Sequence, residues 1–172
     1  KNEKVRIRSN RLSDSLQFKF FQDKYLPASP PFGFPDNMAE QVADSVFGIE
    51  FRDGVTSFIA MPGEGRYLLY GGGSPVMVVH RFYDGFPDIG SIIQMRESLR
   101  YISTDAEYGE MSLLPPRAAI DEFWIKLTGH SERALAQIRR YYGRVEEANR
   151  FFSLSREGWK SDRGMIYIVL GA

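Results

Sequence analysis

Residues 157–170 read Glu157-Gly158-Trp159-Lys160-Ser161-Asp162-Arg163-Gly164 and then Met165-Ile166-Tyr167-Ile168-Val169-Leu170. The first part is polar and rich in glycine, whereas the second is an unbroken apolar run between two glycines. Such a run is typical of a strand that is buried on both faces. We therefore expect a turn that leads from a long helix into a buried C-terminal strand.

The polar part of this stretch has the composition of a rigid turn. Asp and Ser side chains hydrogen-bond to nearby backbone in turns, and glycine adopts positive φ. We expect Gly158, Trp159, Ser161, Asp162 and Gly164 to form a structural motif in which the indole packs into the helical layer. The alternative is a ligand or partner site. Its candidate contacts are Trp159, Asp162, Arg163, Tyr167, Asn149 and Trp124. Catalytic residues are not assigned, because these side chains lack a nucleophile paired with a base.

The same stretch resembles the GWxTD family, named for Gly-Trp-x-Thr-Asp and found mainly in envelope proteins of Bacteroidetes-type bacteria. Gly158, Trp159 and Asp162 match the motif, and Ser161 keeps the hydroxyl of the usual Thr. Similar segments lie upstream: Tyr101 to Tyr108, Ala119 to Trp124, and Tyr141 to Phe152. The likeness is specific from about residue 100 onward.

The resemblance implies a location and an architecture, and it carries over no biochemical activity. It implies an exported protein, of lipoprotein type, in the periplasm or at the outer membrane. Family members usually continue after the strand with Gly-Pro-Pro, so a further C-terminal segment is expected after Gly171-Ala172. A chain that begins at Lys1 without Met also reads as a processed or trimmed fragment.

Composition bounds the possible functions. The 172 residues are 43% hydrophobic, enough for one domain or two small ones. Lys and Arg total 22 and so do Asp and Glu, which gives a net charge of zero and argues against nucleic acid as a partner. The absence of cysteine excludes disulfides and thiolate ligands. No stretch approaches the roughly 18 apolar residues of a transmembrane helix.

The N-terminal half has the period of β-structure. Apolar residues alternate with polar ones over 5–8, 16–20 and 47–51, and the first two segments are expected to pair as a hairpin. Asp53-Gly54 predicts a tight hairpin turn, and a glycine-rich loop predicts a second hairpin between 67–70 and 76–83. Four prolines between Leu26 and Asp36 predict an extended loop.

The C-terminal half has helical signals. Thr104 and Glu107 form a capping box, Pro116 and Gly129 bracket a second helix, and Ser131 is expected to cap a third helix that ends near Phe152. Asn149 lies in the apolar stripe of that third helix, so its amide needs a buried partner, for which we expect the backbone of 158–164.

The resulting fold class is α+β. An antiparallel, sandwich-like β-rich domain is expected over 1–83, a connector over 84–100, and a helical region over 101–172 with three helices and the buried strand.

Other candidate sites are weaker. His80 falls in phase with the β pattern and His130 lies in a helix connection, so no metal site or cofactor is predicted. Asp121 and Glu122 fit a solvated helix face better than a catalytic acid pair, and Glu122 is expected to contact Lys126 at i,i+4. Aromatic residues around the proline-rich loop (Tyr25, Phe32 and Phe34) could form a platform for a glycan or a protein.

Three functions remain open. The favoured one is a non-catalytic envelope module that binds a protein or polymer partner. The second is a hydrolase that uses Asp162 with Arg163 and groups from a missing C-terminal segment. The third is a structural or assembly subunit of unknown oligomeric state.

Overall fold

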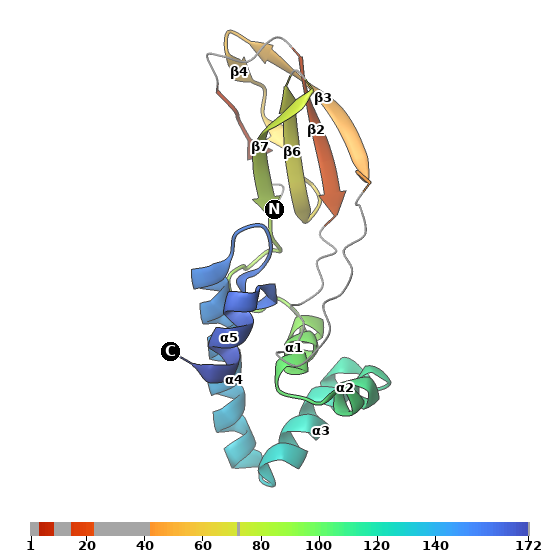
Figure 1. The fold of residues 1–172 in the computed structure, drawn as a ribbon, viewed down its shortest axis with the longest axis vertical. Helices are drawn as coiled ribbons and strands as arrows, with labels where there is room; N and C mark the ends of the chain where they lie inside the picture. Colours follow the sequence, from red (N-terminus) through yellow and green to blue (C-terminus); the bar gives the residue numbers. More distant parts are fainter. Residues whose placement is uncertain (1–3, 9–14, 23–41, 72, 172) are drawn as a thin grey trace. The chain divides into compact units, whose positions relative to one another are not determined.

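A computed structural model of the chain describes residues 4–8, 15–22, 42–71 and 73–171. These residues divide into two compact units, one ending at Asp84 and the other beginning at Gly85. The first unit contains the strands and the second the helices (Figure 1). The α+β fold class predicted from the sequence is confirmed.

The first unit is built on a five-stranded antiparallel sheet in the order β4-β3-β2-β6-β7. Its strands are β2 (Ser15–Gln22), β3 (Ser45–Arg52), β4 (Val55–Thr56), β6 (Gly65–Gly71) and β7 (Ser74–Arg81). Two short strands, β1 (Lys4–Val5) and β5 (Ile59–Ala60), form a separate antiparallel pair. Phe18 of β2, Tyr67 of β6 and Ile59 of β5 share one core. The expected sandwich is therefore a large sheet with a two-stranded pair packed against it.

Two of the three predicted hairpins are confirmed. Asp53 and Gly54 have φ of 52° and 73° and join β3 to β4, as the Asp-Gly turn requires. β6 and β7 pair across the glycine-rich loop. The hairpin predicted between 5–8 and 16–20 is wrong, because β1 pairs with β5 and β2 lies between β3 and β6. Alternation identifies a strand but not its neighbour.

Three predicted helices are present in the second unit. They are α2 (Asp105–Ser112), α3 (Pro116–Thr128) and α4 (Ser131–Phe152). The Thr104 capping box forms on both sides, and Gly129 ends α3 with φ of 71°. Ser131 is the first residue of α4 and His130 takes the N-cap position, one residue before the predicted cap.

Two further helices correct the sequence-based picture. α1 (Ile92–Ser98) lies within the stretch expected to be a connector, where the Ser91 side chain accepts a hydrogen bond from the Gln94 N–H. A short 3-10 turn, η1 (Leu99–Tyr101), follows it. The predicted C-terminal strand is wrong: these residues belong to the helix α5 (Asp162–Leu170).

The burial pattern shows why α5 is helical. Gly164, Met165 and Ile168 are buried, whereas Ile166 and Leu170 are 52% and 77% exposed, which is a helical and not an alternating spacing. Ser161 caps the helix, with its side chain accepting the Gly164 N–H. An apolar run of six residues fits a buried strand or a short helix equally well. Ser161 and Asp162 are residues typical of turns, but they are equally typical of a helix N-cap and first turn, and the structure uses them in that way.

The helical unit has one hydrophobic core. It combines Trp124 of α3 with Tyr141 and Tyr142 of α4, and Trp159 with Ile168 of α5. The phenol of Tyr141 donates to the Ser98 carbonyl, and that of Tyr142 donates to the Met95 carbonyl at 3.2 Å. Burial raises the pKa of Tyr142 to about 12 and raises that of Tyr141 well above its usual value.

These buried phenols predict a loss of stability at high pH. The unfolded chain releases tyrosine protons near pH 10, so the folded state binds more protons between about pH 10 and 12, and the free energy of unfolding falls by up to about 1.4 kcal/mol per pH unit for each group. Tyr142→Phe should cost about 1 kcal/mol at pH 8, where only the hydrogen bond is lost. Above pH 10 it should lose stability less steeply than the wild type in urea titrations. Parallel pH profiles would contradict this account.

Candidate functional site

The stretch 158–164 forms a corner that turns the chain from α4 back along it into α5 (Figure 1). A 3-10 turn, η2 (Gly158–Lys160), opens the corner. The Ser161 N–H donates to the Gly158 carbonyl at 3.0 Å and closes it. We refer to residues 158–164 as the 158–164 corner.

Two glycines let three backbone segments touch within the corner. A Cβ on Gly158 would lie 1.9 Å from the Ala148 carbonyl oxygen of α4. A Cβ on Gly164 would lie 1.9 Å from the Gly158 carbonyl oxygen. Both contacts are with backbone, which cannot swing aside as a flexible side chain can. Any larger residue at either position would therefore push α4, η2 and α5 apart.

The hydroxyl of Ser161 links the two halves of the corner. Its Oγ donates to the Gly158 carbonyl at 2.6 Å and accepts the Gly164 N–H at 3.0 Å. The second bond satisfies one of the free N–H groups at the start of α5. A hydroxyl is sufficient for both bonds, so threonine fits the same chemistry.

Asn149 and Tyr101 hold the backbone of Trp159. The Trp159 N–H donates to Asn149 Oδ1 at 3.2 Å, and its carbonyl accepts the Tyr101 hydroxyl at 2.9 Å. The Asn149 Nδ2 donates to the Pro87 carbonyl at 2.9 Å. Asn149 and Trp159 are each 1% exposed. The expected bond between the Asn149 amide and the corner is confirmed, and its second partner was not foreseen.

Residues 87–89 are fastened to α4 beside this amide. The Ile89 N–H donates to Glu146 Oε1 at 3.2 Å, and Arg150 forms an ion pair with Asp88 at 2.8 Å. With the Asn149 bond, three consecutive residues are held by three side chains on adjacent turns of α4. The helix therefore positions the corner and the start of the helical unit together.

A buried ion pair lies at the entrance to the corner. Lys160 Nζ is 3.0 Å from Glu157 Oε1, and their side chains are only 13% and 7% exposed. The same ammonium lies 5.5 Å from the centre of the Trp159 ring. Glu157 Oε2 is buried without a hydrogen-bond partner in the part of the chain that the structure describes. Such a pair is more costly to break than it is stabilising to form.

Comparison with known protein families shows which family contains this motif. A family model described as the GWxTD domain matches residues 67–172, more than half of the chain. The chain belongs to the GWxTD family. The match begins in β6, well upstream of the region where the sequence motifs are specific. No curated protein and no solved structure matches the chain.

The residues considered as ligand contacts in this GWxTD protein do not gather at one place. Trp159 and Asn149 are in contact and buried, and Trp124 is buried beside Tyr141 and Tyr142 elsewhere in the core. Asp162 and Arg163 are exposed at the start of α5. Within the described residues neither of these two side chains forms an ion pair.

Tyr167 lies between the two helices. Its hydroxyl donates to Glu147 Oε2 of α4 at 2.8 Å, and this bond to a carboxylate raises the pKa of the phenol. Its ring centre lies 5.5 Å from that of Phe152 and 6.3 Å from that of Phe151. Tyr167 is half-buried and packs against the edge of the core, and it therefore joins α5 to α4.

The two histidines lie on separate elements of the chain. His80 lies on β7, where burial and the charge of Arg66 lower its pKa, and His130 is exposed at the start of α4. Among the residues that the structure describes, no group of three potential metal ligands occurs. In the same residues, no helix combines the length and apolar character needed to cross a membrane. The platform proposed from Tyr25, Phe32 and Phe34 lies outside the described residues.

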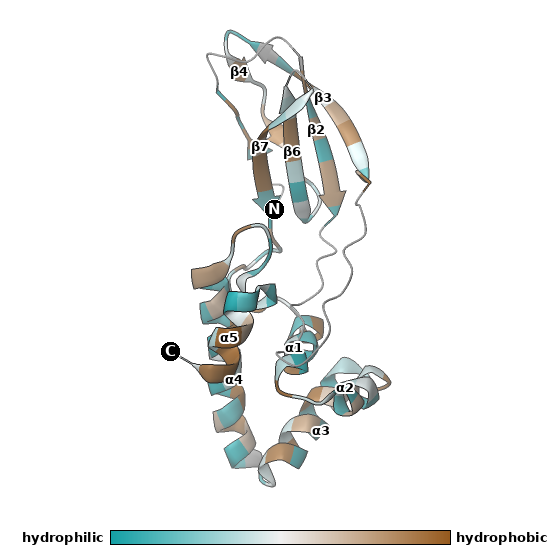
Figure 2. Cartoon of the chain, in the orientation of Figure 1, coloured by the Kyte–Doolittle hydropathy of each residue, from teal (hydrophilic) through white to brown (hydrophobic). Residues whose placement is uncertain are grey.

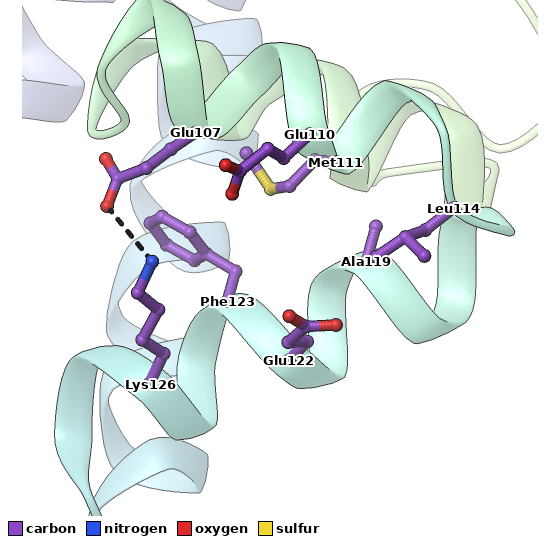
Figure 3. A pocket seen from close by; sticks show the side chains of 8 residues that line it. All are labelled: Glu107, Glu110, Met111, Leu114, Ala119, Glu122, Phe123 and Lys126. Carbon is purple, nitrogen blue, oxygen red and sulfur yellow. Dashed lines mark ion pairs between the residues drawn. The ribbon is translucent and has the colours of Figure 1, made fainter.

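A small pocket between α2 and α3 was not predicted. Glu107, Glu110, Glu122 and Lys126 surround an apolar floor that includes Phe123 (Figure 3). Lys126 pairs with Glu107 at 3.9 Å instead of the expected Glu122, and Asp121 pairs with Arg117. The volume is about 30 Å³, room for about one water molecule. We assign no ligand to it.

An exposed apolar surface beside the corner was also missed. We use the name α4–α5 face for the exposed side chains of Phe151, Leu154, Ile166 and Leu170 together with the half-buried Tyr167, whose ring contacts that of Phe151. Phe151 and Leu154 are 66% and 81% exposed. Figure 2 shows how hydrophobic α5 is along this part of the chain. Reading 162–170 as a helix would have placed Ile166 and Leu170 on one side, opposite Gly164 and Ile168.

The glycine contacts predict opposite effects for two Gly→Ala changes. Gly158→Ala should cost about 3 kcal/mol or more, because the methyl group meets the Ala148 backbone. Gly143→Ala, in the same helix that carries Ala148, should stabilise by about 0.5–1 kcal/mol, since a Cβ there meets nothing within 4 Å. Thermal and urea unfolding measure both. Equal effects would show that the close approach does not limit the corner.

The Ser161 hydroxyl gives a second prediction. Ser161→Thr should change the free energy of unfolding by less than about 0.5 kcal/mol, because both hydrogen bonds remain possible. Ser161→Ala should cost about 1 kcal/mol or more through loss of the helix cap. Urea denaturation of the three proteins compares them directly. If Thr proved as costly as Ala, the hydroxyl would not be the group that matters.

Proposed function

We propose that this GWxTD protein is a non-catalytic module of the cell envelope that acts by binding another protein chain through the α4–α5 face. The envelope location is supported by membership of a family that is found mainly in envelope proteins. The binding role is supported by one observation, the exposed apolar side of α5 next to Phe151 and Leu154.

It is unusual for a helix as apolar as α5 to leave one side exposed to solvent. Helices that are apolar on all sides are normally buried all round. Here one side packs on α4 and the other side exposes Ile166 and Leu170. Phe151, near the end of α4, contacts Tyr167 of α5, and the exposed Leu154 follows just after α4. Large exposed apolar patches usually mark interaction sites.

The surface is held in a fixed shape before any partner arrives. The 158–164 corner sets the start of α5, and Arg144 Nη1 donates to the Ile168 carbonyl at 3.1 Å near its end. Tyr167 adds its bond to Glu147 and its ring contacts with Phe151 and Phe152. Surfaces that are ordered in advance lose less entropy on binding, which favours affinity.

The chemistry of the face favours a protein over a polar polymer. It combines the aliphatic side chains of Leu154, Ile166 and Leu170 with the rings of Phe151 and Tyr167, whose centres lie 6.3 Å apart. Protein interfaces use such aromatic and aliphatic anchors at a desolvated centre with a polar rim. Asp162 and Arg163 supply charges of both signs at the start of α5.

Site-specific photo-crosslinking in the producing cells tests the proposal. A benzophenone amino acid at Leu154 should form adducts with protein, and Leu170→Glu in the same chain should reduce them. The matched control is the same crosslinker at Leu113, which is 87% exposed at the end of α2 and outside the face.

A binding role for the face would be refuted if adducts at position 154 were no more abundant than at position 113. It would also be refuted if Leu170→Glu did not reduce the amount of adduct at position 154. Turnover of a model ester, peptide or glycoside that Asp162→Asn abolishes without lowering the melting temperature would instead favour the hydrolase.

A further inference from the structure

We infer that the chain which covers the α4–α5 face is a second copy of this protein, paired through α5 about a two-fold axis. This inference rests on the proposed binding function and specifies its partner. Two features of α5 support it, the spacing of its exposed apolar residues and the placement of its charges, and the charge balance of the whole chain is the third.

The exposed residues of α5 are spaced for helix pairing. Ile166 and Leu170 are both exposed and lie four residues apart, so they share one side of the helix, as in the seam between two helices that run side by side. Ile166 and Leu170 would meet their own counterparts across a two-fold axis parallel to the helices. Such an axis makes the surface complementary to itself.

The charges at the start of α5 suit the same arrangement. Asp162 and Arg163 are exposed neighbours of opposite sign, on the two flanks of the Ile166–Leu170 stripe. When two such helices run in the same direction about a two-fold axis, the Asp162 flank of one faces the Arg163 flank of the other. Two ion pairs can then form at the rim of the apolar contact.

Net charge points to the same partner. The chain carries 22 basic and 22 acidic residues, so two copies approach without net repulsion. Proteins near zero net charge associate more readily than charged ones. The face itself has no surplus of one sign that would select an acidic or a basic partner.

The size of the contact requires α4 as well as α5. A stable interface buries about 800 Å² on each partner, more than the exposed side of a nine-residue helix supplies. Phe151 contacts Tyr167 of α5 and Leu154 follows shortly after it, so these two exposed side chains are the nearest source of additional apolar area.

Sedimentation equilibrium and light scattering on the full chain test the inference. The wild type should show a concentration-dependent rise toward twice its 19.7 kDa mass. Leu170→Glu should weaken the dimer at least about tenfold in Kd, as expected when a charge replaces an apolar anchor. Leu113→Glu is the matched control and should leave the dimer unchanged, and circular dichroism should show all variants folded.

A charge exchange tests the relative direction of the two helices. Arg163→Asp should weaken the dimer by setting carboxylates against one another, and the double change Asp162→Arg with Arg163→Asp should restore it. If the double change does not restore the dimer, the two α5 helices do not run in the same direction.

A strict monomer up to millimolar concentration, or a dimer that Leu170→Glu does not weaken, overturns the inference. If the chain stays monomeric and position 154 crosslinks to a different protein, the partner is not a second copy of this chain, but the binding function stands. The absence of any face-dependent crosslink removes both.

Discussion

The contact between the backbones at Ala148 and Gly158 is the constraint from which the helical unit follows. Only glycine allows η2 to approach α4 so closely, and that approach brings the Trp159 N–H within reach of Asn149. The indole then fills the core between η1, α4 and α5. Ser161, bonded to the carbonyl of the same Gly158, starts α5 at a fixed point and direction. Removal of a buried indole of this kind typically costs about 3–5 kcal/mol.

The surface used in our proposals is a product of this constraint. A nine-residue helix is marginal by itself and depends on the tertiary contacts that fix it. The corner holds its beginning, Tyr167 its middle and Arg144 its end, so that Ile166 and Leu170 remain on the outer side. The residues that define the family thus lie mainly inside the fold, while the neighbouring residues present the face. The buried side of α5 thus stabilises the fold, and its exposed side is the one proposed to bind a partner.

Local signals were the most reliable guides in the sequence. The capping box at Thr104, Gly129 after α3, and Asp53-Gly54 each act over a few residues, and each forms as expected. Non-local features were not accessible in the same way: the pairing of β1 with β5 and the bond from Asn149 to Pro87 join residues far apart in the chain. The strand predicted at 165–170 failed for another reason. The unbroken apolar run between two glycines fits a buried strand as well as a short helix, and the Ser161 cap together with packing on α4 decided the conformation. The α4–α5 face was missed with it.

The fastening of residues 87–89 to α4 has a mechanical consequence. Tension that reaches Gly85 along the chain from β7 would first load the side chains of Glu146, Asn149 and Arg150, before it could unwind α1. All three anchors lie on one helix, and the Asn149 side chain also accepts the Trp159 N–H. Loss of this one amide would therefore loosen residues 87–89 and the 158–164 corner together.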